Sequence, residues 1–454
     1  MCEKDVGEQK KKHLCAEKRR EKPPCVMLST QIIFYLLATL YPLTLSSNTD
    51  VPSSAGVSFR HQPGYHVFEP SKASPVGDRK IRSAFHYMQN TSEKFIIQGK
   101  EHPARNNTRS AWRPKFAIPR ETSTFALDSM KFNCSDKYAP ECRNKTRQFR
   151  GKIVELLEKS AKENPEEGPN IYNVTYKSRR ALKSPMCGIL KAGLRTLRRK
   201  DFIKIPERFT LFDLVPKRRI FDKQNIKSCA VVSSAGSLAN SKLGRFIDLH
   251  DLVMRFNHAP TEGFEVDVGS KTTIRLINSQ VVSKAEFQFL TSPIFRNITI
   301  AAWDPCRYNA SLDEWLEAPD FDLFTNFQLY SMDNASRGNF YIIDPRSIWR
   351  LWESLQDYFQ TPVRRNPPSS GFLGIALLIP ICSYIDVIEY IPSVRLNGRC
   401  HYYDTEMNPA CSFGEWHPLA AEKLMALDMN SADDYAIFQS GILRIRSSQR
   451  MDCK

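Results

Sequence analysis

From about Cys187 to the C-terminus, short apolar runs alternate with amphipathic stretches. Six apolar runs have the length typical of buried strands, and they lie at 230–232, 252–256, 274–277, 298–302, 340–343 and 387–391. Four amphipathic stretches predict helices at 237–243, 348–359, 372–382 and 418–429. Strands that alternate with helices favour an α/β domain: a mostly parallel sheet with helices on both faces.

Residues 46–180 have a different pattern. This stretch is rich in Pro, Ser, Asn, Arg and Lys and has no long apolar periodicity. Such a composition buries too little apolar surface to offset chain entropy, so we expect a flexible stem with one short helix at 151–162. The folded domain is expected at 181–454.

The N-terminal part predicts a membrane anchor. Residues 25–45 carry no charged side chain and match the ~20 residues that span a bilayer core. Residues 1–24 carry eight Lys and Arg side chains, whereas 46–59 carry none. By the positive-inside rule, 1–24 is a cytosolic tail and the rest is lumenal or extracellular. A cleaved signal peptide is the alternative, but a 24-residue charged leader favours an uncleaved anchor.

Cysteines and glycosylation sequons agree with this orientation. Nine of the 12 cysteines follow the predicted anchor, and oxidising compartments favour disulfides. Without two CxxC pairs, a zinc ribbon is not indicated. Sequons occur only after the anchor, at Asn90, Asn106, Asn133, Asn144, Asn173, Asn297, Asn309 and Asn334.

Net charge excludes few classes of binding partner. The formal charge of +16 is compatible with a nucleic acid, a membrane surface or an anionic substrate. No Lys/Arg-rich run is interleaved with aromatic residues in a nucleic-acid motif, so no nucleic-acid partner is expected.

Small polar residues follow three of the predicted strands. Ser233 and Ser234, Asn257, and Asn278 each come directly after an apolar run. Ligands of open α/β sheets bind beyond the carboxyl ends of the strands. Each residue alone is explained by turn chemistry. Three together, with Gly236 permitting close backbone approach, indicate a ligand site.

Two further segments supply an anion site and a base. The sequence Asn366-Pro-Pro-Ser-Ser-Gly371 leads into a predicted helix, whose first N–H groups favour a phosphate. An N-cap role would explain Ser370 alone, but not the whole Pro-Pro-Ser-Ser-Gly sequence. His417 stands at a predicted helix start, and its imidazole can accept a proton at physiological pH.

These segments resemble the motifs of the animal sialyltransferase family. Residues 229–280 resemble its large motif, 366–389 the small motif, His401-Tyr-Tyr-Asp404 the third, and His417 with Glu422 the very small motif. All four motifs occur in the order found in the family, and their residues are most similar to those of the β-galactoside α-2,6-sialyltransferases.

The resemblance implies a variant GT-A (Rossmann-like) fold and a single-pass type II enzyme of the Golgi membrane. It implies inverting transfer of sialic acid from CMP-sialic acid to the 6-hydroxyl of terminal galactose or N-acetylgalactosamine on glycoprotein glycans, with His417 as the base. The implied donor-binding residues are Ser234, Asn257, Asn278, Ser369, Ser370, Gly371, Cys400, His401, Ser412, Trp416 and Lys423. The implied acceptor-binding residues are Gln280, Trp303, Tyr308 and Asp320.

The resemblance also implies disulfides. The implied pairs are Cys229 with Cys382, Cys400 with Cys411, and Cys187 with Cys453. Cys134, Cys142 and Cys306 are left over; a Cys134 to Cys142 bond would close an extra loop.

Asp320-Phe-Asp322 fits a DxD metal motif. CMP-sialic acid carries one phosphate rather than a pyrophosphate, so it needs less neutralisation of charge. We therefore expect the Asp320 and Asp322 carboxylates to contact the acceptor or to be structural, with no metal and no cofactor. Two alternatives stay open: a sialyltransferase of other linkage or acceptor, and an inactive sialoglycan-binding membrane protein.

Overall fold

The structure, a computed structural model, describes residues 127–162, 169–178, 181–182, 184–202, 213–222, 225–333, 339–359, 361–408, 410–414, 416–447 and 453. The predicted tail at 1–24, the anchor at 25–45, and the sequons at Asn90, Asn106 and Asn334 lie outside these residues. None of the helices within the described ranges is long and apolar enough to cross a bilayer.

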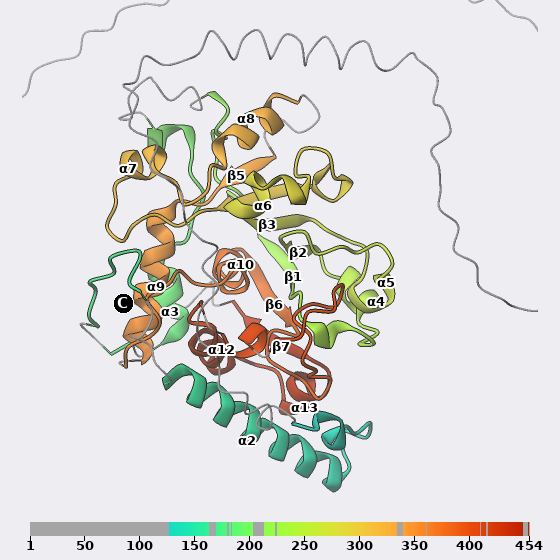
Figure 1. The fold of residues 1–454 in the computed structure, drawn as a ribbon. Coiled ribbons are helices and arrows are strands. Elements are labelled where there is room, and N and C mark those ends of the chain that lie inside the picture. Colours follow the sequence, from blue (N-terminus) through green and yellow to red (C-terminus); the bar gives the residue numbers. More distant parts are fainter. Residues whose placement is uncertain are drawn as a thin grey trace, which may run out of the picture. The chain divides into compact units, whose positions relative to one another are not determined.

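A seven-stranded sheet forms the centre of the described part, in the order β5-β4-β3-β2-β1-β6-β7 (Figure 1). Strands β1 to β6 pair in parallel, and only β7 runs antiparallel to β6. The strands are β1 (Ile226–Val232), β2 (Leu252–Phe256), β3 (Ile274–Asn278), β4 (Thr299–Trp303), β5 (Phe340–Ile342), β6 (Cys382–Ile388) and β7 (Ile442–Arg446). The prediction of a mostly parallel sheet is therefore correct.

Successive side chains of a strand point to opposite sides of the sheet, so both faces carry apolar residues. Helices cover both faces. In β1, Val231 belongs to the large core beneath α10 (Ser370–Leu378), whereas Ala230 and Val232 belong to a smaller core beneath α4 (Gly244–Asp248). Figure 1 shows α10 and α4 on opposite sides of β1. Strands buried on both faces explain their continuous apolar sequences.

The remaining helices connect the strands or cover their ends. They are α3 (Pro185–Ala192), α5 (Glu265–Val268), α6 (Ser279–Ser283), α7 (Leu312–Glu317), α8 (Phe324–Met332), α9 (Pro345–Phe359), α11 (Ala410–Phe413), α12 (Leu419–Asp428) and α13 (Asp434–Phe438). Short 3₁₀ turns lie at Ser129–Phe132, Arg199–Phe202, Gly236–Leu238, Ala285–Phe287 and Pro293–Phe295.

Three predicted elements differ from the structure. The strand expected at 387–391 is β6 (Cys382–Ile388), which begins five residues earlier because its polar Ser383 and Asp386 interrupt the apolar sequence. The helix expected at 237–243 is instead a 3₁₀ turn, a loop and then α4, because Asn240 and Lys242 adopt positive φ. The Asp267 carboxylate holds that loop by accepting from both backbone N–H groups. The helix expected at 372–382 ends at Leu378, and its last residues belong to the turn into β6.

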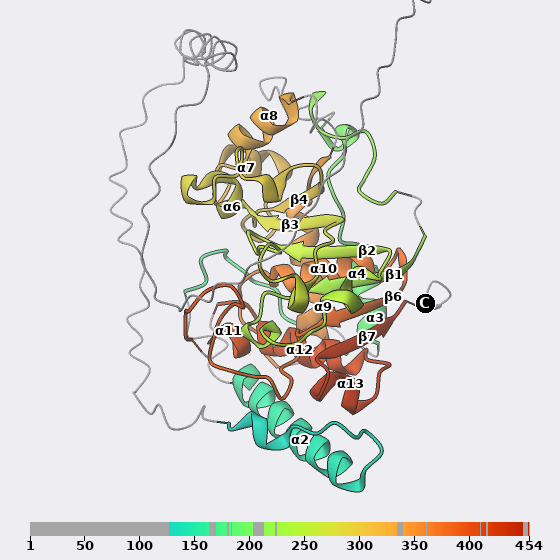
Figure 2. The ribbon, with the colours of Figure 1, turned by 90° about the vertical axis from the view of Figure 1, so that its right-hand side faces the viewer.

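The described part of the expected stem, residues 127–162 and 169–178, includes a long helix. Helix α2 (Pro140–Lys162) packs against α12 and α13, side by side with them in Figures 1 and 2. Its buried residues Phe149, Ile153 and Leu157 recur every four positions, so they form one stripe on an otherwise polar helix. Folded structure is therefore present before residue 181, in the described residues from 127 onward.

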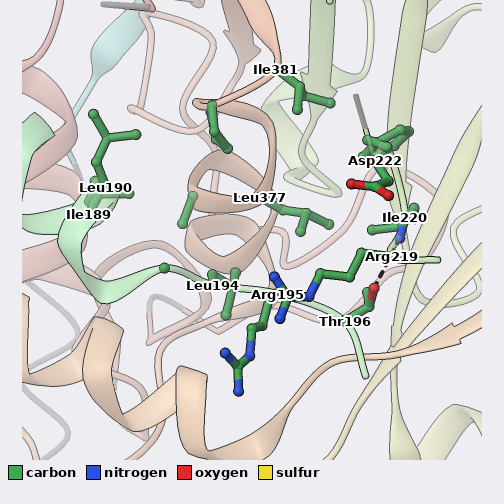
Figure 3. A pocket seen from close by; sticks show the side chains of 14 residues that line it. Ile189, Leu190, Leu194, Arg195, Thr196, Arg219, Ile220, Asp222, Leu377 and Ile381 are labelled. Atoms are coloured by element: carbon green, nitrogen blue, oxygen red, sulfur yellow. Dashed lines mark hydrogen bonds between the residues drawn. The ribbon is translucent and has the colours of Figure 1, made fainter. Parts of the chain in front are cut away.

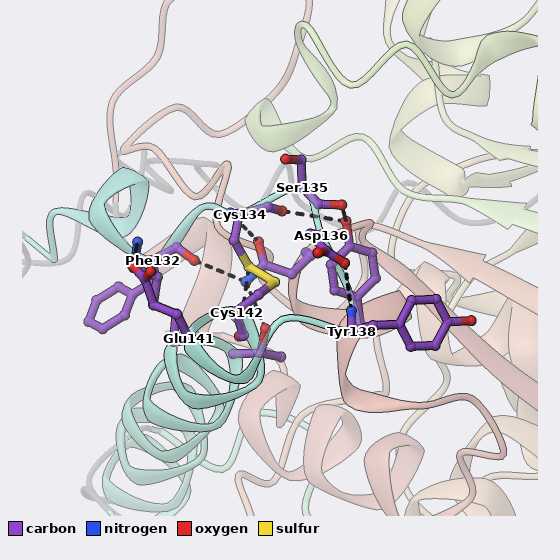
Figure 4. The surroundings of a disulfide bond; sticks show 11 residues. Phe132, Cys134, Ser135, Asp136, Tyr138, Glu141 and Cys142 are labelled. Carbon is purple, nitrogen blue, oxygen red and sulfur yellow. Dashed lines mark hydrogen bonds and ion pairs between the residues drawn. A yellow bond between two sulfur atoms is a disulfide. The ribbon is translucent and has the colours of Figure 1, made fainter.

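The structure contains the three implied disulfides, Cys187–Cys453, Cys229–Cys382 and Cys400–Cys411. Cys134–Cys142 is a fourth, at the start of α2 (Figure 4), and Cys306 is a buried thiol. The Cys229–Cys382 bond ties β1 to the beginning of β6 and so joins two segments 153 residues apart.

Candidate functional site

The two predicted asparagines meet where β2 and β3 end. The Asn278 backbone N–H donates to the Asn257 Oδ1 at 3.1 Å, and Asn257 adopts a φ of 46°. The Asn278 Oδ1 in turn accepts from the Val281 N–H at 3.0 Å and caps α6. Both carboxamides therefore hold defined orientations at the same edge of the sheet.

Trp303 extends this edge toward α10. It is the register partner of Asn278 across β3 and β4. Its indole Nε1 donates to the Ser370 Oγ at 2.9 Å, and its ring centroid lies 6.3 Å from that of His417. One indole thus joins the strand ends, the start of α10 and the predicted base.

The His417 ring is fixed by the chain before α10. Its Nδ1 lies 2.7 Å from the Pro367 carbonyl oxygen. A carbonyl can only accept, so Nδ1 carries the hydrogen and Nε2 carries the lone pair. Burial lowers the pKa of His417 to about 4, which keeps the imidazole neutral. Trp416 packs edge-on against it, with ring centroids 4.4 Å apart.

A buried carboxylate orders the start of α10. Glu422 accepts from the Ser369 N–H at 2.8 Å, from the Ser369 Oγ, and from the Tyr390 hydroxyl at 3.1 Å. Ser369 also caps α10 by accepting from the Phe372 N–H. Burial raises the pKa of Glu422 to about 7, although these hydrogen bonds oppose the shift. His417 and Glu422, five positions apart, therefore hold the same short segment: His417 at Pro367 and Glu422 at Ser369.

Lys423 follows Glu422 and is also buried. Its ammonium donates to the Ser412 carbonyl oxygen and lies 5.8 Å from the centre of the Tyr390 ring. Burial lowers the pKa of Lys423 to about 8, and the charge of Glu422 opposes that shift. The hydrogen bond joins α12 to α11, which carries Cys411 at the end of the loop closed by the Cys400–Cys411 disulfide.

That loop packs along the turn after β1. The Tyr402 N–H donates to the Ser234 carbonyl oxygen at 3.2 Å. A Cβ on Gly236 would lie 2.6 Å from the Arg399 carbonyl oxygen, so only glycine permits this approach. Gly236 is a close-approach position, but its neighbour in the structure is the Arg399 backbone, so chain packing explains this glycine without a ligand.

His401 and its neighbours form an aromatic group on this loop. The His401 Nδ1 lies 2.6 Å from the Asp404 Oδ2, and its ring stacks on Tyr403 with centroids 5.0 Å apart. The Tyr403 ring also contacts His258, which directly follows Asn257. The third motif therefore lies beside the large motif.

Two of the four expected acceptor residues, Tyr308 and Asp320, contact Tyr172. Its hydroxyl donates to the Asp320 Oδ2 at 3.3 Å, and its carbonyl oxygen accepts from the Tyr308 N–H. Its ring lies 6.4 Å from Trp416. Gln280 is not linked to this group by a hydrogen bond that we observe, and its Oε1 accepts from Lys284.

Asp304 fixes the chain next to Asp320. Its carboxylate accepts from the backbone N–H groups of Asp320 and Phe321 and from the Trp315 indole. Burial raises the pKa of Asp304 to about 6, and those hydrogen bonds act in the opposite direction. Asp322 is engaged separately, because its carboxylate caps the first turn of α8.

Sequence reasoning missed Tyr172, Asp304 and Tyr390. Tyr172 lies in the expected stem, where the composition gave no reason to seek a site residue. Asp304 directly follows β4, as Asn278 ends β3, so its position after a strand was a usable signal. Tyr390 was hidden inside an apolar run.

Comparison with known proteins identifies one family. Residues 194–433 match the family described as Glycosyltransferase family 29 (sialyltransferase). That range is more than half of the chain, and it contains every residue discussed in this section except Tyr172.

Named relatives are similar to the same part of the chain. A β-galactoside α-2,6-sialyltransferase 2 of Bos taurus is 41% identical over 239 residues, which are 53% of this chain and 48% of that protein. The protein of that name from Homo sapiens is 42% identical over 230 residues, 51% of this chain and 43% of that protein. The chain thus spans about half the length of these curated relatives.

One solved structure, described as a mammalian sialyltransferase, aligns over 61% of this chain and 94% of its own. The sequence identity is 18% and the TM-score is 0.34, a likeness too weak to support an argument.

Proposed function

Because the chain belongs to glycosyltransferase family 29, the sialyltransferases, we propose that it transfers sialic acid from CMP-sialic acid to a sugar hydroxyl. The acceptor in this proposal is the 6-hydroxyl of a terminal galactose or N-acetylgalactosamine on glycoprotein glycans. The names of the relatives support the α-2,6 linkage.

The contact of His417 with both Trp303 and Pro367 carries the proposal. Its Nδ1–H is held by the Pro367 carbonyl, so the free Nε2 is the atom that can accept a proton. In the proposed step, the acceptor oxygen attacks the anomeric carbon of sialic acid as Nε2 takes its proton. The bond to the phosphate oxygen breaks, CMP leaves with the electron pair, and the anomeric configuration inverts.

The start of α10 is the proposed stabiliser of the leaving phosphate. Ser369, Ser370 and Gly371 stand at its positive end, where backbone N–H groups favour an anion. A Cβ on Gly371 would lie 2.9 Å from the Tyr390 ring, so the backbone packs closely here. Ser234, Asn257, Asn278, Cys400, His401, Ser412, Trp416 and Lys423 remain the proposed donor-side residues.

The acceptor is proposed to lie on the Tyr172 side. Trp303, Tyr308 and Asp320 are joined to Tyr172 or to His417 by the contacts described above. Indole and phenol rings suit the apolar faces of sugars, and a carboxylate suits their hydroxyls. Gln280 is retained as the fourth proposed acceptor residue.

The proposed cellular setting is the Golgi membrane, with a type II anchor at 25–45 and a lumenal catalytic domain of variant GT-A type. Four disulfides support an oxidising compartment. The described sequon residues Asn133, Asn144, Asn173, Asn297 and Asn309 are all exposed, as glycosylation requires.

We also propose that transfer needs no metal. The carboxylates of the DxD segment have protein partners, since Asp320 accepts from Tyr172 and Asp322 caps α8. A single phosphate also carries less charge to neutralise than a pyrophosphate.

The test is an assay of the full-length chain with CMP-sialic acid and two acceptors, type-2 lactosamine and LacdiNAc. We expect CMP release and a product whose sialic acid is linked to the 6-hydroxyl. A product of another linkage would contradict the α-2,6 assignment and indicate a sialyltransferase of other linkage. Acceptor binding without CMP release would indicate an inactive sialoglycan-binding protein.

A further inference from the structure

A cavity of about 340 Å³ lies away from the proposed site, at the other end of α10. Ser370 begins that helix, whereas Leu377 lines the cavity just before the turn into β6. Segments 189–196 and 219–222 complete its walls (Figure 3). Its volume falls in the range of about 300–1,000 Å³ that is usual for ligand pockets.

Part of the wall is aliphatic. Ile189, Leu194, Ile220, Leu377 and Ile381 line it, and all five are buried. Such a surface favours an aliphatic group of a ligand, because burying it removes apolar area from water.

One part of the wall is cationic. Arg195 and Arg219 lie near each other at the end opposite Ile381 in Figure 3. Arg195 is paired, since its guanidinium donates twice to the Asp344 carboxylate. The Arg219 Nε is buried and has no hydrogen-bond partner within the described ranges. Arg219 lines the cavity and forms no ion pair within the described ranges, so a ligand carboxylate beside its guanidinium would supply the missing partner.

Arg219 lies among other cations. Burial lowers the pKa of Arg219, and repulsion from Arg198 and Arg195 adds to the shift. Arg195 already has a carboxylate partner in Asp344, whereas Arg219 has none within the described ranges. A ligand with a single negative charge would supply that partner.

We propose that this cavity binds a small molecule with a carboxylate on an aliphatic group. The carboxylate pairs with Arg219, and the aliphatic group packs among Leu194, Leu377 and Ile381. A carboxylate fits better than a phosphate monoester, because the monoester carries nearly two negative charges and the site supplies one. This proposal does not rest on the sialyl-transfer function.

The test is calorimetric titration of the full-length chain with hexanoate, hexanamide and acetate. Hexanamide keeps the aliphatic group without the charge, and acetate keeps the charge without most of the aliphatic group. We expect hexanoate to bind at least about tenfold more tightly than either, since the charge-assisted hydrogen bond and the apolar contact both contribute. Equal affinity of hexanamide, or no heat with hexanoate, would overturn the proposal.

Two variants locate the binding. Arg219→Gln should weaken hexanoate about tenfold and leave hexanamide unchanged. Arg218→Gln is the matched control, because Arg218 is exposed, does not line the cavity, and should bind like the unmodified chain. Hexanoate binding that is equal in the Arg219→Gln and Arg218→Gln proteins would refute the role of Arg219.

A cavity-filling variant and a competitor complete the design. Leu190→Trp should weaken the binding of hexanoate and of hexanamide alike, because the larger side chain fills the cavity. This variant tests the assignment to the cavity if Arg219→Gln fails to fold. Saturating CMP should leave hexanoate binding unchanged. Displacement by CMP would place hexanoate in the proposed donor site and overturn the assignment to this cavity.

Discussion

The His417 imidazole is hydrogen-bonded through Nδ1 to the Pro367 carbonyl oxygen, at 2.7 Å. Pro367 lies two residues before the Ser369 that caps α10. The proposed base and the proposed phosphate-binding helix are therefore positioned by the same short segment. A shift of that segment would displace both groups together.

Removing the base should abolish transfer and preserve donor binding. We expect His417→Ala to lower kcat by about 10²- to 10⁴-fold, the usual contribution of a general base. The affinity for CMP, measured by calorimetry, should stay close to that of the unmodified chain. Near-normal turnover would show that another group accepts the proton.

The pH at which activity falls on the acid side should be unusually low. A general base works only when unprotonated, so activity falls as pH drops through its pKa. Burial lowers the pKa of His417 to about 4, from an ordinary value near ~6.5. We expect kcat/KM to persist below pH ~6.5 and to fall only near pH 4. Circular dichroism at each pH checks that the protein stays folded, and a midpoint at 6.5 or above contradicts the prediction.

Glu422 should make stability depend on pH. Burial raises its pKa to about 7, so the folded state binds this proton more tightly than the unfolded chain. Its contribution is therefore greatest below the unfolded pKa near ~4.3 and is lost as pH rises to 7, by about 3 kcal/mol.

The isosteric variant Glu422→Gln should remove that dependence. Its single side-chain carbonyl cannot accept all the hydrogen bonds that Glu422 now accepts from Ser369 and Tyr390, so we also expect a loss of about 1–3 kcal/mol. Denaturant unfolding at pH 5 and pH 8 measures both effects. An unchanged difference between the two pH values would argue against a raised pKa.

Two glycines should respond oppositely to substitution by alanine. Gly236→Ala places a Cβ against the Arg399 carbonyl oxygen, so we expect a loss of about 1–3 kcal/mol in unfolding free energy. Gly151 is the matched control: it lies inside α2 with nothing within 4 Å of an added Cβ. Gly151→Ala should be stabilising by about 0.5–1 kcal/mol. Equal effects in thermal unfolding would contradict the packing argument.

Chelation should leave transfer unchanged. The DxD carboxylates already have protein partners, and the donor carries one phosphate. We expect full activity in excess EDTA. Activity that is lost in EDTA and restored by Mn²⁺ would show a metal requirement.

Strands such as β2 and β4 were predictable because they are buried on both faces and so form continuous apolar runs. Strand β6 was placed five residues too late because Ser383 and Asp386 interrupt its apolar sequence. The predicted 252–256 is the strand β2 itself. Strand β7 was missed because it lies at the sheet edge, where Arg444 and Arg446 alternate with apolar residues. Helix α2 was underestimated because its buried stripe gains stability only from contact with α12 and α13.

The sequence by itself determined which residue types stand at the ends of the strands and at the start of α10. It did so because turn and cap residues follow from local backbone requirements. Only the tertiary structure decided that Trp303 joins Asn278 to Ser370, that Pro367 orients His417, and that Tyr172 reaches Asp320. Those contacts link positions far apart in the chain, and local propensity carries no information about which distant groups will meet.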